Sequence, residues 1–237
     1  MNFSARKCRE AVGAVRKCGR QRGFTLVELL VVVAIILILA ALIFAISMSA
    51  MRKAEKVQCL TQIRDVSTAM NSFASDYQHP PIPDAKKTSG MDAVYGDPGG
   101  TDQTDFVVAA LMGKQDQLPT FPGGVAAEAA KANPKGEAYW TPDFVDDKKK
   151  GVGRHDGRYY DPWGHEIMFA INTPPYTDKD AGGKNDSKLM TYGKADYADT
   201  APREQDFVVW SYGKDGKMGR VDNGQIFFRG SDDVISW

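Results

Sequence analysis

The chain has 237 residues with 30 basic and 30 acidic side chains, and these charges are unevenly distributed. The residues before Gly23 hold seven Arg or Lys and one Glu, so the remainder keeps 23 basic and 29 acidic residues, a net charge of −6. An acidic chain argues against nucleic acid as the partner. Without the basic N-terminal segment and the apolar segment that follows it, roughly 150–190 residues remain, which is the size of one domain.

Residues 29–46 form an apolar run without any charged or polar side chain. At ~1.5 Å rise per residue, its 18 residues cover ~27 Å as a helix, close to the ~30 Å hydrocarbon core of a bilayer. Because positive charge stays on the cytoplasmic side, we expect the N-terminus inside and the rest of the chain outside. The basic residues before the run are Arg6, Lys7, Arg9, Arg16, Lys17, Arg20 and Arg22.

Glu28 breaks this pattern, because it places a carboxylate at the start of the apolar run. An unpaired charge in the bilayer costs about 2.5–3.5 kcal/mol on insertion scales. We therefore expect Glu28 to have a partner.

The basic leader, Gly23, Phe24 and the sequence Thr-Leu-Val-Glu at 25–28 closely resemble the class III signal of type IV pilins and type II secretion pseudopilins. The resemblance implies that a prepilin peptidase cuts between Gly23 and Phe24 and N-methylates Phe24. It also implies that Glu28 pairs with the Phe24 ammonium of a neighbouring subunit in a filament. An ordinary signal peptide would instead place its cleavage site after the apolar run.

The sequence predicts one long helix from Phe24 to about Gln78, since no Gly or Pro occurs between Phe24 and His79. Its second half has one apolar stripe with steps of three and four residues, and prolines from Pro80 onward end it. We expect a leader at 1–23, a transmembrane or filament-core helix at 24–51, and a periplasmic head at 52–237 in which the helix continues over 52–79. The stripe consists of Val57, Leu60, Ile63, Val66, Met70, Phe73 and Tyr77.

The first part of the head contains weak signals. Residues 84–100 are predicted as a loop, and 105–113 as a short helix with Asp105 as N-cap and Gly113 past its end. Residues 126–132 suit another short helix, and 146–150 form a solvated charge run.

Two strands are predicted in the second part of the head. Asp-Pro-Trp-Gly at 161–164 is a turn signal, and 165–171 follow as a strand with alternating apolar residues. Residues 173–204 are expected to be an irregular excursion before a second strand at 206–212. The fold class is therefore α+β, a long helix packed on a small antiparallel sheet. The turn also resembles a recurrent marker of major pseudopilins.

Residues 213–224 and the chain end at 231–237 are rich in Asp and Gly, which supply hard oxygen ligands of the kind that Ca²⁺ prefers. They resemble the calcium loop of major pseudopilins, which implies side-chain ligands from Asp215 and Asp222. The backbone carbonyls of Tyr212, Gly219 and Gly224 are further implied ligands. Residues 225–230 separate this loop from Asp232 and Asp233 by more residues than in the major pseudopilin pattern. The remaining calcium ligands are therefore not assigned. The alternative is a solvated hairpin without metal.

No enzymatic motif occurs in the chain: the three histidines are scattered, and a Gly-x-Ser-x-Gly elbow and a phosphate-binding loop are both absent. Only Cys59 lies outside the leader, so an intrachain disulfide is excluded in a chain cut after Gly23. We expect Cys59 to be an apolar filler on a helix face.

These features together predict a structural subunit most like the major pseudopilin of a type II secretion system, without enzymatic activity. The expected partners are further copies in a helical filament, the prepilin peptidase, minor pseudopilins and an inner-membrane assembly platform. Alternatives are a type IV pilin for adhesion, motility or DNA uptake, a minor pseudopilin, and a membrane-anchored periplasmic enzyme or binding protein.

Overall fold

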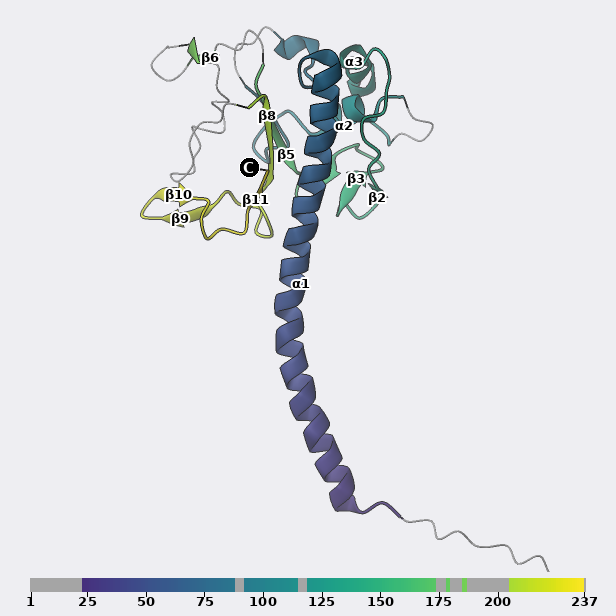
Figure 1. The fold of residues 1–237 in the computed structure, drawn as a ribbon, viewed down its shortest axis with the longest axis vertical. Coiled ribbons are helices and arrows are strands. Elements are labelled where there is room, and N and C mark those ends of the chain that lie inside the picture. The colour runs from purple at the N-terminus through teal and green to yellow at the C-terminus, as the bar shows by residue number, and fades with distance from the viewer. Residues whose placement is uncertain are drawn as a thin grey trace, which may run out of the picture. The chain divides into compact units, whose positions relative to one another are not determined.

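The computed structural model describes residues 23–87, 92–114, 119–173 and 205–236, together with two short strands at 178–179 and 185–186. Contacts along the chain divide it into two compact units, 1–48 and 49–237. The second unit is called the head below. The elements are drawn in Figure 1.

Helix α1 runs from Leu26 to Tyr77 and is the longest element. It contains an 18-residue window with a mean hydropathy of 3.6, so by length and composition it could cross a membrane. After Tyr77 the backbone turns left-handed at Gln78, with φ of 62°, and two prolines at 80 and 81 follow. Proline cannot continue a helix, which explains where α1 ends.

The part of α1 in the head packs through one stripe of buried side chains. Val57 was predicted to belong to this stripe but is 63 % exposed. The stripe begins at Cys59 instead, and that thiol is fully buried, as expected for an apolar filler. The buried members are Cys59, Ile63, Val66, Ala69, Met70 and Phe73.

A four-stranded antiparallel sheet packs against this stripe, with strand order β1-β5-β8-β11. The two central strands were both predicted, although β5 begins later than expected and the loop predicted at 84–100 contains β1. The four strands are β1 (Ala93–Tyr95), β5 (Met168–Ile171), β8 (Phe207–Ser211) and β11 (Val234–Ile235).

Both faces of this sheet are buried. Phe169, Ile171 and Val209 join the core that contains the α1 stripe. Met168, Val208 and Trp210 point to the other face, where apolar side chains of the C-terminal segment cover them. The alternation predicted for the first strand is therefore confirmed, and the C-terminal segment is a third layer. Its covering side chains include Tyr212, Met218, Ile226, Phe228 and Ile235.

The remaining elements are short. Thr104 rather than the predicted Asp105 occupies the N-cap position of α2, and its side chain makes no capping hydrogen bond. Asp105 is already helical, and its carboxylate accepts a hydrogen bond from the Phe106 N–H at 2.8 Å. Strands β2 and β3 pair in parallel, and β4 pairs with β3 antiparallel. The elements are η1 (Asp84–Lys86), α2 (Asp105–Met112), α3 (Val125–Ala132), β2 (Phe144–Val145), β3 (Gly151–Gly153), β4 (Tyr159–Tyr160), β6 (Asp178–Lys179), β7 (Asn185–Asp186), β9 (Arg220–Asp222) and β10 (Gln225–Phe227). Most of the predicted excursion at 173–204 lies outside the described residues.

The turn predicted at 161–164 is organised by the buried carboxylate of Asp161. One oxygen accepts hydrogen bonds from the N–H groups of Trp163, Gly164 and His165 at 2.9, 2.8 and 3.0 Å. The other accepts the Ser211 hydroxyl at 2.6 Å. Ser211 ends β8, so Asp161 fixes the turn to the central sheet.

We predict that Asp161→Ala lowers the free energy of unfolding by about 3 kcal/mol, because it leaves the buried Ser211 hydroxyl and three partly buried N–H groups without their acceptor. Asp161→Asn retains one acceptor oxygen and should cost about 1 kcal/mol. Urea unfolding of the full mature chain in detergent, followed by tryptophan fluorescence, measures both. Equal stability of the Ala variant and the wild type would contradict this role.

The same side chain predicts a pH dependence. Burial is the largest influence and raises the pKa of Asp161, although the hydrogen bonds act against it. The folded state therefore keeps a proton to higher pH than the unfolded state. As pH rises from the ordinary pKa of about 4 through the raised value, this contribution to stability is lost. Asp161→Asn should flatten the decline, and an unchanged slope would contradict the assignment.

Candidate assembly site and C-terminal loop

The predicted cleavage site is exposed at the start of the described chain. Gly23 and Phe24 precede α1, and the Phe24 side chain is 79 % exposed. A Cβ built on Gly23 meets no described atom within 4 Å. The peptide bond between these residues is therefore not covered by the described part of the chain.

Glu28 has a partner within its own chain, Thr25, which was not predicted. The Thr25 N–H and hydroxyl both donate to Glu28 Oε2, at 2.9 and 2.7 Å. In return, the Glu28 N–H donates to the Thr25 hydroxyl oxygen at 3.2 Å. This is a capping box, in which a Thr N-cap and a Glu three residues later satisfy each other's backbone donors. The spacing of Thr25 and Glu28 is a readable sequence signal for it.

The two oxygens of Glu28 are used unequally. Both Thr25 donors go to Oε2, and Oε1 accepts no hydrogen bond from the residues that the structure describes. One oxygen therefore caps the helix of its own chain, whereas the other can accept a donor from elsewhere.

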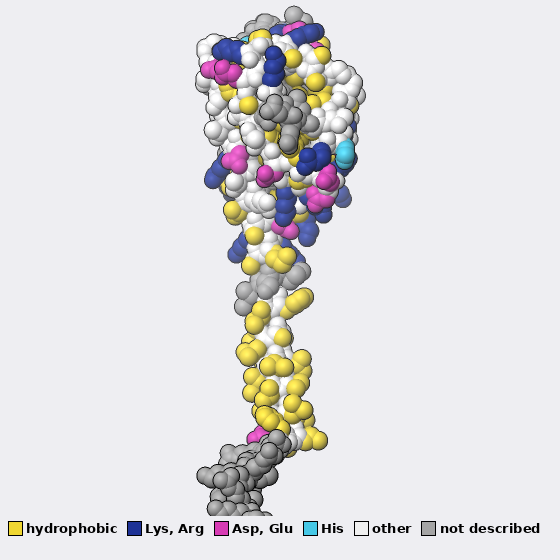
Figure 2. Space-filling view, turned by 90° about the vertical axis from the view of Figure 1, so that its right-hand side faces the viewer, with side chains coloured by type: hydrophobic (Ala, Val, Ile, Leu, Met, Phe, Trp, Pro, Cys, Tyr) yellow, Lys and Arg dark blue, Asp and Glu magenta, His cyan; other side chains and the backbone are white. Residues whose placement is uncertain are grey.

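The apolar side chains that follow Glu28 are exposed within the first unit. The large hydrophobic residues that are exposed between Leu26 and Phe44 have exposed fractions from 41 % at Val33 to 79 % at Leu26. Figure 2 shows this continuous apolar surface along the helix. Such a surface needs lipid or other helices around it.

The predicted calcium ligands lie on the C-terminal segment of the head. Asp215 lies in the turn after β8, and its carboxylate accepts the Lys217 N–H at 2.9 Å. Asp222 ends β9 and lies 3.6 Å from the Arg220 guanidinium. Gly224 is in the turn of the β9–β10 hairpin, and the Tyr212 and Gly219 carbonyls belong to the same segment.

Asp232 and Asp233 organise this loop through backbone amides. Asp232 accepts the N–H groups of Lys214 and Asp215 at 2.6 and 3.1 Å. Asp233 accepts the Gly219 N–H at 2.9 Å. The described residues contain no group of three or more His, Cys, Asp or Glu side chains that could hold a metal ion. Such a group counts side chains alone, whereas Tyr212, Gly219 and Gly224 were predicted to contribute backbone carbonyls, so calcium binding stays a prediction.

Comparison with known proteins assigns the N-terminal part. Residues 18–50 match a family model described as "Prokaryotic N-terminal methylation motif". The match includes Gly23, Phe24 and Glu28. No curated protein and no solved structure matches the chain. The motif indicates a type IV pilin-like protein, and it implies processing by a prepilin peptidase and pilus-like assembly. Together with the apolar helix, it fits anchoring in a membrane.

We predict that Thr25→Val loosens the first turn of α1, because it removes the hydroxyl but keeps the shape of the side chain. An N-cap contributes about 1 kcal/mol, so amide hydrogen exchange at Glu28 and Leu29 should become about fivefold faster. Thr25→Ser retains the hydroxyl and is the matched control. NMR on the mature chain in micelles measures the rates. Identical exchange in the Val variant and the wild type would contradict the capping box.

The calcium prediction is tested by a chelator. If Ca²⁺ joins the loop to the chain end, its removal from the full mature chain should lower the melting temperature of the head. Asp215→Asn should abolish the calcium-dependent shift, whereas Asp147→Asn, an acid outside the loop, should retain it. A melting temperature that is insensitive to calcium would remove the prediction.

Proposed function

We propose that this protein is the structural subunit of a type II secretion pseudopilus. It is made as a precursor, cut after Gly23, N-methylated at Phe24, and assembled into a helical filament for protein export. The observation that carries the proposal is the N-terminal methylation motif together with a Glu28 carboxylate of which only one oxygen has a described partner.

Glu28 Oε1, which has no described hydrogen-bond partner, would require neighbouring helices to assemble at one fixed axial position. In hydrocarbon, a carboxylate with half of its acceptors unused is costly. Cleavage after Gly23 would create an ammonium at Phe24, which is a donor of opposite charge. If neighbouring helices align so that this ammonium meets Oε1, each group removes the other's penalty. Sliding by one turn would separate them by about 5.4 Å.

The C-terminal half of the chain supports the secretion branch. The Asp-Pro-Trp-Gly turn, which resembles a marker of major pseudopilins, is built into the core through Asp161 and Ser211. Type IV pilin heads often carry a C-terminal disulfide, whereas a chain cut after Gly23 retains only the buried Cys59.

Deletion of the gene would separate the two branches. A secretion subunit predicts loss of protein export, whereas a type IV pilin predicts loss of adhesion, motility or DNA uptake.

The remaining assignments follow from this function. The subunit is a single-pass protein of the inner membrane with its head in the periplasm before assembly. It works with minor pseudopilins and an inner-membrane platform and performs no chemistry itself. In the filament, the apolar N-terminal helices of the assembled subunits would pack together and form the shaft.

The direct test replaces Glu28 by Gln, which removes the charge but keeps the size. We expect the precursor to be cut normally and filament yield to fall at least about tenfold, corresponding to the loss of about 1.4 kcal/mol per contact. Glu128→Gln, a charge removal on α3, is the control and should assemble normally. Pelleting and electron microscopy measure filaments, and gel mobility measures cleavage. Normal filaments from the Gln variant would contradict the proposal.

A further inference from the structure

Six exposed basic residues occupy the end of the head where α1 enters it. Three lie in the first turns of α1 after the apolar run, and three form the loop between β2 and β3. Figure 2 shows Lys and Arg side chains gathered at this end, with Asp and Glu among them. The basic patch consists of Arg52, Lys53, Lys56, Lys148, Lys149 and Lys150.

Contacts through the 161–164 turn bring the two groups together. The Trp163 indole N–H donates to Glu55 on α1 at 3.1 Å. At the next residue, a Cβ on Gly164 would lie 3.3 Å from the Lys148 carbonyl and 3.6 Å from Lys149 Cε. The Lys150 N–H donates to the Asp161 carbonyl at 3.0 Å. The loop therefore lies against the turn, and the turn contacts α1 one helical turn from Arg52.

The patch is positive in a chain that is otherwise acidic. Its six basic residues have three acidic neighbours in sequence, Glu55, Asp146 and Asp147, which leaves an excess of three positive charges. Lys148 is bound by Asp156 at 3.0 Å. Arg52, Lys53 and Lys149 form no side-chain ion pair with any residue that the structure describes, so their charges can meet an external partner.

The backbone of the loop is strained at two of these lysines. Lys148 and Lys150 have φ of 55° and 63°, in the left-handed region that favours Gly or Asn. The two left-handed residues flank Lys149, whose side chain is exposed.

We propose that the basic patch binds the anionic phospholipid headgroups of the membrane that holds α1. This inference rests on the membrane anchoring in the proposed function. Arg52 follows Ile46 by six residues, which rise about 9 Å as a helix, so the first basic residues lie within about one Debye length of the headgroups. Cleavage after Gly23 removes seven basic residues from the other flank, which leaves this patch as the basic flank of the apolar run.

Binding of headgroups would orient the head on the membrane surface before a subunit enters the filament. Juxtamembrane Lys and Arg attract anionic lipids, and the attraction falls within a Debye length. The interaction should therefore be lost at high salt, whereas the apolar helix should remain inserted.

The experiment places a fluorophore beside the patch. Val57 is 63 % exposed, and Cys59 is fully buried, so Val57→Cys in the full mature chain gives one reactive thiol. The labelled chain is reconstituted in vesicles of equal parts phosphatidylcholine and phosphatidylglycerol. Quenching by a headgroup-labelled phosphatidylglycerol tracer is compared with quenching by the matching phosphatidylcholine tracer. Resistance of the chain to carbonate extraction is measured on the same vesicles.

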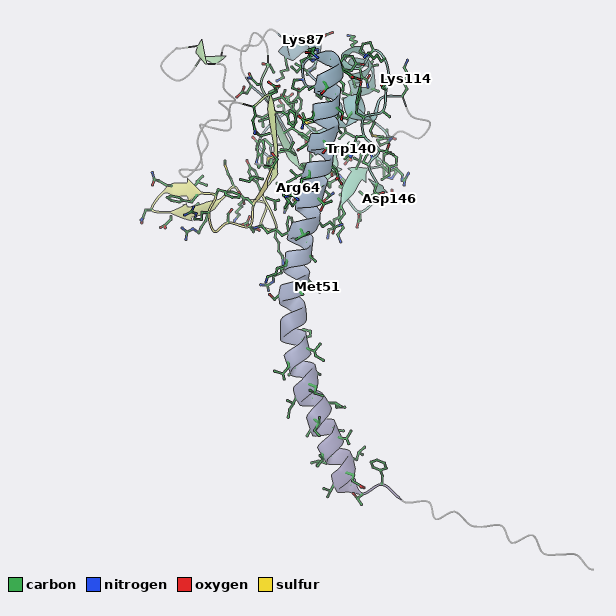
Figure 3. All side chains as sticks on the ribbon, in the orientation of Figure 1. Met51, Arg64, Lys87, Lys114, Trp140 and Asp146 are labelled. Atoms are coloured by element: carbon green, nitrogen blue, oxygen red, sulfur yellow. The ribbon has the colours of Figure 1, made fainter. Side chains whose placement is uncertain are left out.

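We expect the anionic tracer to quench about twofold more strongly at low salt, with the difference lost at high salt. Lys53→Gln with Lys149→Gln should reduce the ratio toward one. Lys114→Gln with Lys131→Gln removes the same charge elsewhere and should leave the ratio unchanged. In Figure 3, Lys114 lies at the end of the head that is far from Met51, whereas Asp146 lies closer to Met51.

Two outcomes separate this inference from the function on which it rests. Equal quenching by both tracers in a carbonate-resistant wild type would overturn lipid binding by the patch and leave the anchoring intact. Extraction of the wild type by carbonate would refute the anchoring and this inference together.

Discussion

The constraint on which the structure depends is a carboxylate at the head of an apolar helix. Glu28 is acceptable there only if its acceptors are satisfied, since nothing in hydrocarbon replaces water. Thr25 satisfies one oxygen within the chain and at the same time caps α1. In the proposed filament, the other oxygen would accept a donor from a neighbouring subunit. Folding of the first helical turn and recognition of a neighbour would then use the same side chain.

The head repeats this use of a carboxylate as an organiser of backbone amides. Asp161 collects three N–H groups of one turn and the Ser211 hydroxyl of β8. Asp232 and Asp233 do the same for the loop that follows β8. The turn, the central sheet and the chain end are thereby joined around a core that α1 completes. The same turn carries the contact with Glu55 that positions the β2–β3 loop near the start of the head.

The sequence predicted the parts of this fold that have strong periodicity or fixed turn chemistry. The long helix, the Asp161 turn and the central strands belong to this class, because each has several residues that specify it. Strands β1 and β11 were missed because two or three residues carry no period. Val57 was wrongly predicted to be buried. Its spacing of three residues from Leu60 fits the helical stripe, but the spacing does not show where along α1 the packing of the head begins. The capping box could have been predicted from the spacing of Thr25 and Glu28. The hydrogen bond from Ser211 to Asp161 and those from backbone amides to Asp232 could not, because they join residues distant in sequence.

The central claim is most directly tested by a distance in the assembled filament. Filaments would be grown from a mixture of subunits, some with ¹⁵N at the Phe24 amino group and others with ¹³C at the Glu28 carboxyl carbon. Solid-state NMR dipolar recoupling then reports only contacts between different subunits. The account predicts a separation of about 4 Å, as in an ion pair. Filaments without any intersubunit coupling between these two atoms would contradict it.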